Sequence, residues 1–188
     1  LTIAPIDIDE HAHPYAMYMF PLGTMVEGRP NFMAVAWVTR VNYQPPMIAV
    51  ALGKSHYTNG GIHASKAFSI NIPSVALLEK TDYCGIVSGK KKDKTGLFSM
   101  TFGEKTGVPL IEECPVQMEC KLITVTDLPN NELFVGEIVG AYADAACCSE
   151  GKPDIEKIRP FTLTMPDNRY WEVGRCAGKA WNDGKNVK

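Results

Sequence analysis

The segment VQMECKLITVT, residues 116–126, decides the fold class, because apolar and polar residues alternate along it. The apolar set is Val116, Met118, Cys120 and Leu122, and the polar set between them is Gln117, Glu119 and Lys121. A period of two residues is typical of a strand with one face in the core and the other in solvent. We therefore expect the apolar set to point inward and the polar set to point outward.

Five further runs rich in β-branched and aromatic residues are separated by Gly, Pro and Asn, which predicts more short strands. They are Tyr15–Phe20, Phe32–Val41, Met47–Leu52, Ala67–Ile72 and Leu133–Tyr142. Two short helices are expected between strands, one capped by Thr58 and running to about Lys66, the other over Val75–Tyr83 and capped by Ser74. Many strands, few helices and no strand–helix repeat predict a mainly β fold built as a closed or partly closed antiparallel barrel.

Length and charge limit the organisation and the partners of the chain. A length of 188 residues, 45% hydrophobic and 21% charged, predicts one globular domain over residues 1–188. With 19 basic and 21 acidic residues, the chain lacks the positive field that collects nucleic acid or an anionic membrane surface. We expect a cytoplasmic protein whose partners are small molecules or proteins, since no apolar run approaches the roughly 18 residues of a membrane span.

Cysteine and histidine positions give little support to metal or disulfide chemistry. The six cysteines are Cys84, Cys114, Cys120, Cys147, Cys148 and Cys176, and none forms a CxxC pair. Free thiols are therefore expected, with the adjacent Cys147 and Cys148 as an alternative redox pair. His11 and His13 form an HxH pair, but we expect no metal site.

Sequence motifs of common catalytic and nucleotide sites are missing. The chain has no GxGxxG after a strand, no GxxxxGK[ST], no GxSxG and no HExxH. We expect no catalytic side chain, and a bound nucleotide would need a different cradle.

Small polar residues and hydrogen-bond donors gather where the predicted strands end. They are Thr39, the segment Lys54–Thr58 and the segment Asn71–Ser74. Hydroxyls and amides at a helix N-terminus suit a phosphate, and a lysine adds charge. The alternative is that Thr58 and Ser74 only cap helices and that Lys54 is a surface residue. The basic run Gly89–Lys94 is expected to be a solvated loop.

Four longer motifs are more specific. They are NFMAVAWVTRVNYQPPMIAVAL (31–52), KSHYTNGGIHASKAFSINIPS (54–74), DYCGIVSGKKKDK (82–94) and NRYWEVGRCAGKA (168–180). Together and in this order they resemble the flavin reductase-like, FMN-binding split-barrel family, in particular flavoredoxins. The resemblance implies an antiparallel, Greek-key-like split β-barrel with a few short helices, which binds FMN as a homodimer.

The resemblance also implies which residues hold the flavin. The flavin ring would lie against two segments, Ala36, Trp37, Val38 and Thr39 in one and Asn71, Ile72, Pro73 and Ser74 in the other. The phosphate would be held by Lys54, Tyr57 and Thr58. A loop that closes on the flavin, often from the neighbouring protomer, is matched by Cys84, Gly85, Ser88 and Gly89.

The function implied is that of an FMN-dependent oxidoreductase or electron-transfer protein supplied by NAD(P)H or by a protein electron donor. Many flavin reductases of the family carry a C-terminal His near the nicotinamide, whereas no His follows His63 here. That difference favours flavoredoxin-like electron transfer. The alternative is a non-enzymatic FMN-binding or storage protein. A pyridoxamine-phosphate-oxidase-like protein would share the barrel, but the chain lacks a basic cluster for a second phosphate.

Overall fold

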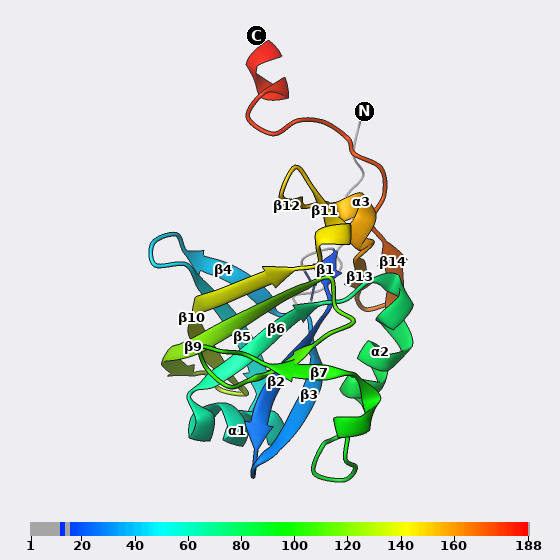
Figure 1. The fold of residues 1–188 in the computed structure, drawn as a ribbon. Helices are drawn as coiled ribbons and strands as arrows, with labels where there is room; N and C mark the ends of the chain where they lie inside the picture. Colours follow the sequence, from blue (N-terminus) through cyan, green and yellow to red (C-terminus); the bar gives the residue numbers. More distant parts are fainter. Residues whose placement is uncertain (1–11, 14–15, 188) are drawn as a thin grey trace.

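A seven-stranded antiparallel sheet forms the body of the protein in the computed structural model, which describes residues 12–13 and 16–187 (Figure 1). Its strands are β2 (Phe20–Val26), β3 (Arg29–Val35), β4 (Val38–Asn42), β5 (Met47–Gly53), β6 (Ala67–Ile72), β9 (Val116–Asp127) and β10 (Asn131–Ala143). Their spatial order is β3-β2-β6-β9-β10-β5-β4. The edge strands β3 and β4 are consecutive in the chain but lie at opposite ends of this order, so the barrel is split between them.

Three smaller sheets and short helices complete the fold. The sheets are β1 (Met17–Tyr18) with β13 (Phe161–Thr164) and β14 (Arg169–Glu172), β7 (Met100–Phe102) with β8 (Pro109–Ile111), and β11 (Cys148–Ser149) with β12 (Lys152–Pro153). The helices are α1 (Tyr57–Ser65), α2 (Leu78–Ile86), α3 (Ile155–Ile158) and the 3₁₀ turns η1 (Val75–Leu77), η2 (Thr95–Leu97), η3 (Ala145–Cys147) and η4 (Asp183–Asn186). None of the helices in the described ranges is long and apolar enough to cross a membrane.

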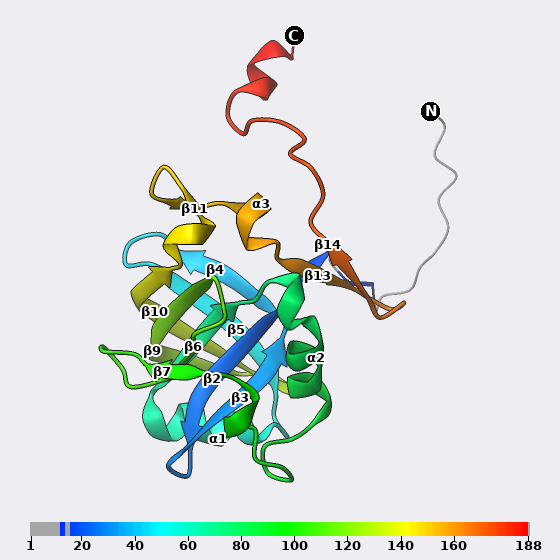
Figure 2. The same cartoon turned by 45° about the vertical axis from the view of Figure 1, so that its right-hand side comes forward.

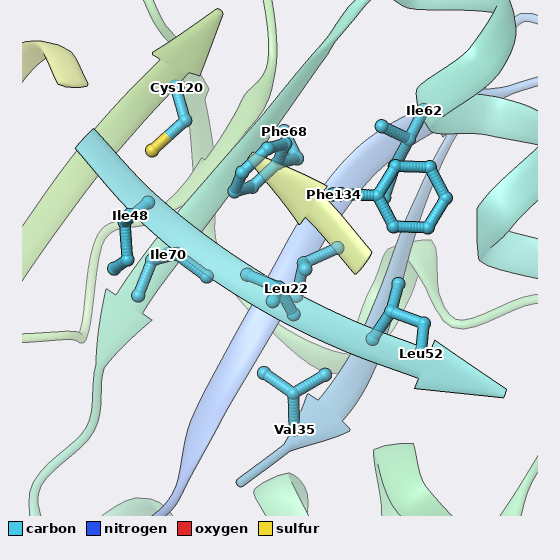
Figure 3. Close-up of a cluster of buried hydrophobic side chains, with 10 residues drawn as sticks. Leu22, Val35, Ile48, Leu52, Ile62, Phe68, Ile70, Cys120 and Phe134 are labelled. Atoms are coloured by element: carbon cyan, nitrogen blue, oxygen red, sulfur yellow. The ribbon is translucent and has the colours of Figure 1, made fainter. Parts of the chain in front are cut away.

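The main core lies inside the curved sheet. Figure 3 shows side chains from several strands and from α1 pointing toward one another, among them Leu22, Ile62, Phe68 and Phe134, which are all fully buried. Burying side chains of this size supplies roughly 1.5–3 kcal/mol each, which offsets the entropy of ordering the strands. α1 packs on β2, and α2 packs on β3 beside the split.

The mainly β, split-barrel prediction is confirmed, and Ala67–Ile72 is a strand with the predicted bounds. The predicted strand Phe32–Val41 is instead divided into β3 and β4. Val38 N donates to the Ala36 carbonyl at 3.0 Å, and this tight turn lets the chain leave one edge of the sheet for the other. Most of β2 and the short strands β7, β8, β11, β12, β13 and β14 were not predicted.

Both predicted helix caps need correction. α1 begins at Tyr57 after an N-cap at His56, so Thr58 lies inside the helix, where its Oγ1 accepts a hydrogen bond from the Asn31 side-chain amide. Ser74 does stand at the N-cap of η1, but its side chain makes no capping hydrogen bond. The helix expected over Val75–Tyr83 is formed by η1 followed by α2, which extends to Ile86.

The predicted outward position of Glu119 is wrong, since this carboxylate is fully buried. A register shift in β10 at Ile138 and Gly140 lies directly opposite it. A Cβ on Gly103 would stand 2.2 Å from the Glu119 carboxylate and one on Gly140 would stand 2.9 Å away, so these glycines leave the space that the side chain fills. The carboxylate is stable there because it accepts hydrogen bonds from Lys105 N, Thr106 and Tyr142.

Lys94 is also buried, with 4% of its surface exposed, so the prediction of a solvated loop fails at the last residue of the run Gly89–Lys94. All six cysteines are free thiols, as expected. His11 of the HxH pair lies outside the described residues.

Candidate functional site

Three adjacent hollows follow the split edge of the barrel from α1 to β4. The polar hollow, of about 300 Å³, is lined by Met33, Ala34, Ser55, His56, Tyr57, Thr58, Cys84, Gly85, Ile86, Val87, Ser88, Gly89 and Lys94. The middle hollow, of about 280 Å³, shares Met33, Ala34 and His56 with it. The apolar groove, of about 620 Å³, shares Ala36, Trp37 and Ala51 with the middle hollow. Neighbouring hollows share wall residues, so the three lie in a row, here called the path, from the side of β3 to β4.

The N-terminus of α1 opens into the polar hollow. Tyr57 and Thr58 are the first two helical residues, so their amides have no helical carbonyl to bond. The first turn of the helix contains no acidic residue, and no side chain caps it. Thr58 Oγ1 accepts a hydrogen bond from Asn31 Nδ2 at 2.9 Å and so keeps its own proton for a second acceptor. The geometry favours an anion at this position.

Tyr57 contributes a second polar group at the rim of the hollow. Its hydroxyl donates to Glu27 Oε2 at 2.9 Å, and this hydrogen bond raises the pKa of Tyr57. The tyrosine is therefore a neutral donor near neutral pH.

The opposite wall carries a buried positive charge. Lys94 Nζ donates to three main-chain carbonyls, those of Phe32, of Cys84 at 3.4 Å and of Val87 at 2.9 Å. Within the part of the chain that the structure describes, Lys94 forms no ion pair with a carboxylate. Burial lowers the pKa of this ammonium group. An anion in the hollow would compensate a charge that the described residues leave uncompensated.

Cys84 lies beside Lys94 and is 2% exposed. Burial raises the pKa of the Cys84 thiol to about 11, against the opposing effect of the Lys94 charge. The thiol therefore stays protonated at neutral pH and is a poor nucleophile.

The loop after α2 shapes the floor of the polar hollow. A Cβ at Gly89 would stand 1.9 Å from Asn31 Oδ1, so only glycine lets the loop approach β3 so closely. Ser88 Oγ accepts a hydrogen bond from Lys90 N at 3.3 Å. Lys94 binds this loop to β3 of its own chain, so Cys84, Gly85, Ser88 and Gly89 line the same hollow as Tyr57 and Thr58.

The other end of the path is aromatic and aliphatic. Ala36, Trp37, Val38 and Thr39 line the apolar groove together with residues of β1 and β5. Trp37 is 48% exposed, and the centroid of its ring lies 6.3 Å from that of His13. This end offers flat apolar surface with few polar groups, which suits a planar heterocycle.

Two of the predicted contact regions lie elsewhere. Lys54 Nζ pairs with Asp127 Oδ1 at 2.5 Å, and Lys54 lines none of the three hollows. The segment Asn71, Ile72, Pro73 and Ser74 lines none of them either. Asn71 is fully buried, where its amide donates to the Pro21 carbonyl at 3.1 Å and its side-chain oxygen accepts from Ile111 N at 2.9 Å. Asn71 therefore fastens β6 to β2 and β8.

Sequence reasoning missed Lys94, Asn31 and the apolar lining from Met33 and Ala34. Asn31, Met33 and Ala34 fall in or beside a predicted strand, where alternation alone does not tell a cavity wall from core. Lys94 ends a run of exposed lysines, and nothing in its local sequence distinguishes it from them.

The open antiparallel barrel has a row of hollows with anion donors at one end and apolar side chains at the other. The chain belongs to the flavin reductase-like family: the model of the flavin reductase like domain matches residues 15–153. Membership supports a flavin-related oxidoreductase or electron-transfer role.

Individual relatives agree with this assignment. A flavoredoxin from Methanosarcina acetivorans, known from a crystal structure, is 46% identical in sequence to this chain. The two structures superpose with a TM-score of 0.95 over 97% of this chain and 98% of that one. A flavoredoxin of Desulfovibrio vulgaris is 36% identical, with a TM-score of 0.87 over 95% of this chain and 100% of that one. An uncharacterized protein of Archaeoglobus fulgidus is 36% identical over 145 residues, which are 73% of this chain and 81% of the relative.

Proposed function

We propose that this protein binds FMN along the path beside β3 and passes electrons through it, as an electron-transfer protein of the flavoredoxin type. The observation that carries the proposal is the row of three adjacent hollows, which changes from polar beside α1 to apolar beside β4. A ligand with a phosphate at one end and a flat ring at the other matches both ends at once.

The polar hollow fits a terminal phosphate. The amides of Tyr57 and Thr58 and the Thr58 hydroxyl are donors on one side, and the buried charge of Lys94 lies on the other. Charge-assisted hydrogen bonds of this kind contribute about 1.5–3 kcal/mol each. With a volume of about 300 Å³, the hollow suits one phosphate and part of a ribityl chain.

The apolar groove supports binding of the ring. Trp37 and Ala36 supply its flat wall, and Thr39 supplies a hydroxyl at its edge. When bound, the isoalloxazine itself supplies the redox chemistry, by accepting and donating one or two electrons. The residues around it need only orient the ring and restrict the access of water, which accounts for a site built without an acid–base pair.

A homodimer is part of the proposal. The sheet ends in the unpaired edges of β3 and β4, and large side chains such as Tyr18 and Trp37 are 41% and 48% exposed beside them. Self-association would cover these edges.

Titration of the cofactor-free protein with FMN and with riboflavin, followed by flavin fluorescence, tests the site. The two ligands share the ring and differ in the phosphate, so FMN should bind at least about a hundredfold more tightly if two or more charged contacts form. Equal affinities would remove the phosphate site from the polar hollow. Release of the native chromophore by heat should give about one FMN per chain.

Reduction by NADH or NADPH, followed at the flavin absorbance band, then separates the electron donors. Slow bleaching by both, with rapid reduction by a protein donor, is expected of an electron-transfer protein. Rapid bleaching by either nucleotide would indicate a flavin reductase. A flavin that no donor reduces would indicate a storage protein.

A further inference from the structure

The last part of the described chain does not pack on the barrel. After β14, residues 173–187, here called the C-terminal arm, run away from the barrel in both views (Figures 1 and 2). Every residue from 174 to 185 is exposed. The arm therefore contributes almost nothing to the core of its own chain.

The end of the arm nevertheless has an ordered turn held by hydrogen bonds. Asp183 Oδ2 accepts a hydrogen bond from Lys179 N at 2.8 Å, and Asp183 Oδ1 accepts one from Asn182 Nδ2 at 3.0 Å. A Cβ on Gly178 would stand 2.5 Å from the Asp183 carboxylate, so the turn requires glycine there. Residues 178–186 thus form a compact knob that ends in η4.

Trp181 is the residue that the knob presents. It is 95% exposed and has a φ of 56°, in the left-handed region. A bulky residue seldom adopts this backbone conformation, which costs of order 1–3 kcal/mol. The hydrogen bonds of Asp183 hold this turn, and they leave the indole presented to solvent, where it is available to another surface. Tryptophan is also enriched among the residues that dominate binding energy at interfaces.

The charge of the arm indicates which kind of surface would receive Trp181. The arm carries Arg175, Lys179 and Lys185 against a single acidic residue, Asp183, whereas residues 12–172 hold 17 acidic and 15 basic side chains. A basic arm is complementary to an acidic barrel of the same sequence. That barrel also exposes apolar side chains outside the proposed flavin path, among them Phe102 at 53% and Ile123 at 47%.

We infer that the C-terminal arm docks on the barrel of a second copy of this chain, with Trp181 as its apolar anchor. The inference rests on the proposed homodimer and adds the element that holds it together. In a symmetric pair each copy gives one arm and receives one, so the contact is made twice.

Sedimentation of the full chain with the substitution Trp181→Ala tests the inference. The wild type should be a dimer, and the variant should dissociate at a concentration at least about 30-fold higher, as loss of an interface anchor predicts. Tyr43→Ala is the matched control, since Tyr43 is 85% exposed in the turn after β4, and it should leave the dimer unchanged. Circular dichroism checks that both variants keep the barrel.

A second variant tests the charge argument without removing the tryptophan. Arg175→Glu with Lys179→Glu should also weaken the dimer, and raising the salt concentration should weaken the wild-type dimer more than this variant. A monomeric wild type would overturn the proposed homodimer itself. A dimeric wild type whose dissociation constant is unaffected by Trp181→Ala would leave the homodimer standing and overturn the role of the arm.

Discussion

The loop 84–94 beside β3 and the turn 103–107 beside β9 are each held by one buried charged side chain, but the charges are opposite in sign. Lys94 donates to the main-chain carbonyls of Phe32, Cys84 and Val87. Glu119 accepts from the amides of Lys105 and Thr106 and from two hydroxyls. In each case one charge satisfies several polar groups that a loop would otherwise bury without partners.

Their surroundings differ in one respect that matters for function. Lys94 forms part of the wall of the polar hollow, whereas Glu119 lines none of the three hollows. Removing the charge of Lys94 is therefore expected to change both ligand binding and the stability of the fold, whereas removing the charge of Glu119 should change stability alone.

The largest effect is expected for Lys94→Met, which keeps an unbranched side chain of slightly shorter length and removes its charge. Three carbonyls lose their donor, so the free energy of unfolding should fall by on the order of 3 kcal/mol. FMN should bind roughly a hundredfold more weakly, because the loop shifts and the charge is lost. Urea denaturation and FMN titration measure the two effects.

The exposed Lys91 provides the control, since Lys91→Met removes the same charge from the same loop. Lys91→Met should change neither the free energy of unfolding nor the FMN affinity appreciably. If Lys94→Met lowered stability but bound FMN normally, Lys94 would be a purely structural residue like Glu119.

Thr58→Ala should weaken FMN binding roughly tenfold to a hundredfold, because one charge-assisted hydrogen bond to the phosphate is lost. Stability should fall by about 1 kcal/mol, since Asn31 Nδ2 loses its acceptor. Thr58→Ser keeps the hydroxyl and should retain most of the affinity. An alanine variant that bound FMN and riboflavin with unchanged affinities would place the phosphate elsewhere.

Glu119→Gln should lower the free energy of unfolding by about 1–3 kcal/mol, because an amide group replaces one of two accepting oxygens. The FMN dissociation constant should stay within about twofold of the wild-type value, a much smaller change than loss of a charge-assisted contact in the polar hollow would cause. Tyr142→Phe removes only one of the hydrogen bonds and should cost about 1 kcal/mol. A large loss of FMN affinity in Glu119→Gln would break the contrast between the two loops.

Acid should act on the same carboxylate. Burial alone would raise the pKa of Glu119, but hydrogen bonds from Tyr142, Thr106 and Lys105 outweigh burial and hold the pKa below its ordinary value of 4.5. A depressed folded-state pKa adds stability above the unfolded-state value, and this stability is lost as the pH falls through the folded-state pKa. The wild type should therefore lose stability below about pH 4.5 more steeply than Glu119→Gln in urea denaturation at stepped pH.

The smallest effect is expected for Lys54→Ala. Lys54 is paired with Asp127, and exposed ion pairs contribute at most about 1 kcal/mol. FMN affinity should change less than about fivefold. A loss as large as that of Thr58→Ala would mean that Lys54 leaves Asp127 and turns to the phosphate, as the resemblance implies.

Much of the fold follows from patterns that are local in the sequence. Ala67–Ile72, Met47–Gly53 and the long strands β9 and β10 are rich in β-branched residues and bounded by turn residues, so their existence was predictable. Tyr57, Thr58, Cys84, Gly85, Ser88 and Gly89 were chosen from motifs, and the structure brings these six together in one hollow.

Local sequence patterns thus predicted the β content and the antiparallel barrel, because strand periodicity depends on near neighbours, and the resemblance of the longer motifs implied the segments that meet at the polar hollow. Only the tertiary structure decided that Lys94 rather than Lys54 lies in its wall, that Glu119 points inward, and that the chain crosses between sheet edges at Ala36 and Trp37. The physical reason is that burial of a charge depends on its hydrogen-bond partners. Those of Lys94 include the Phe32 carbonyl, 62 residues away in the chain, and no local pattern records such a distance.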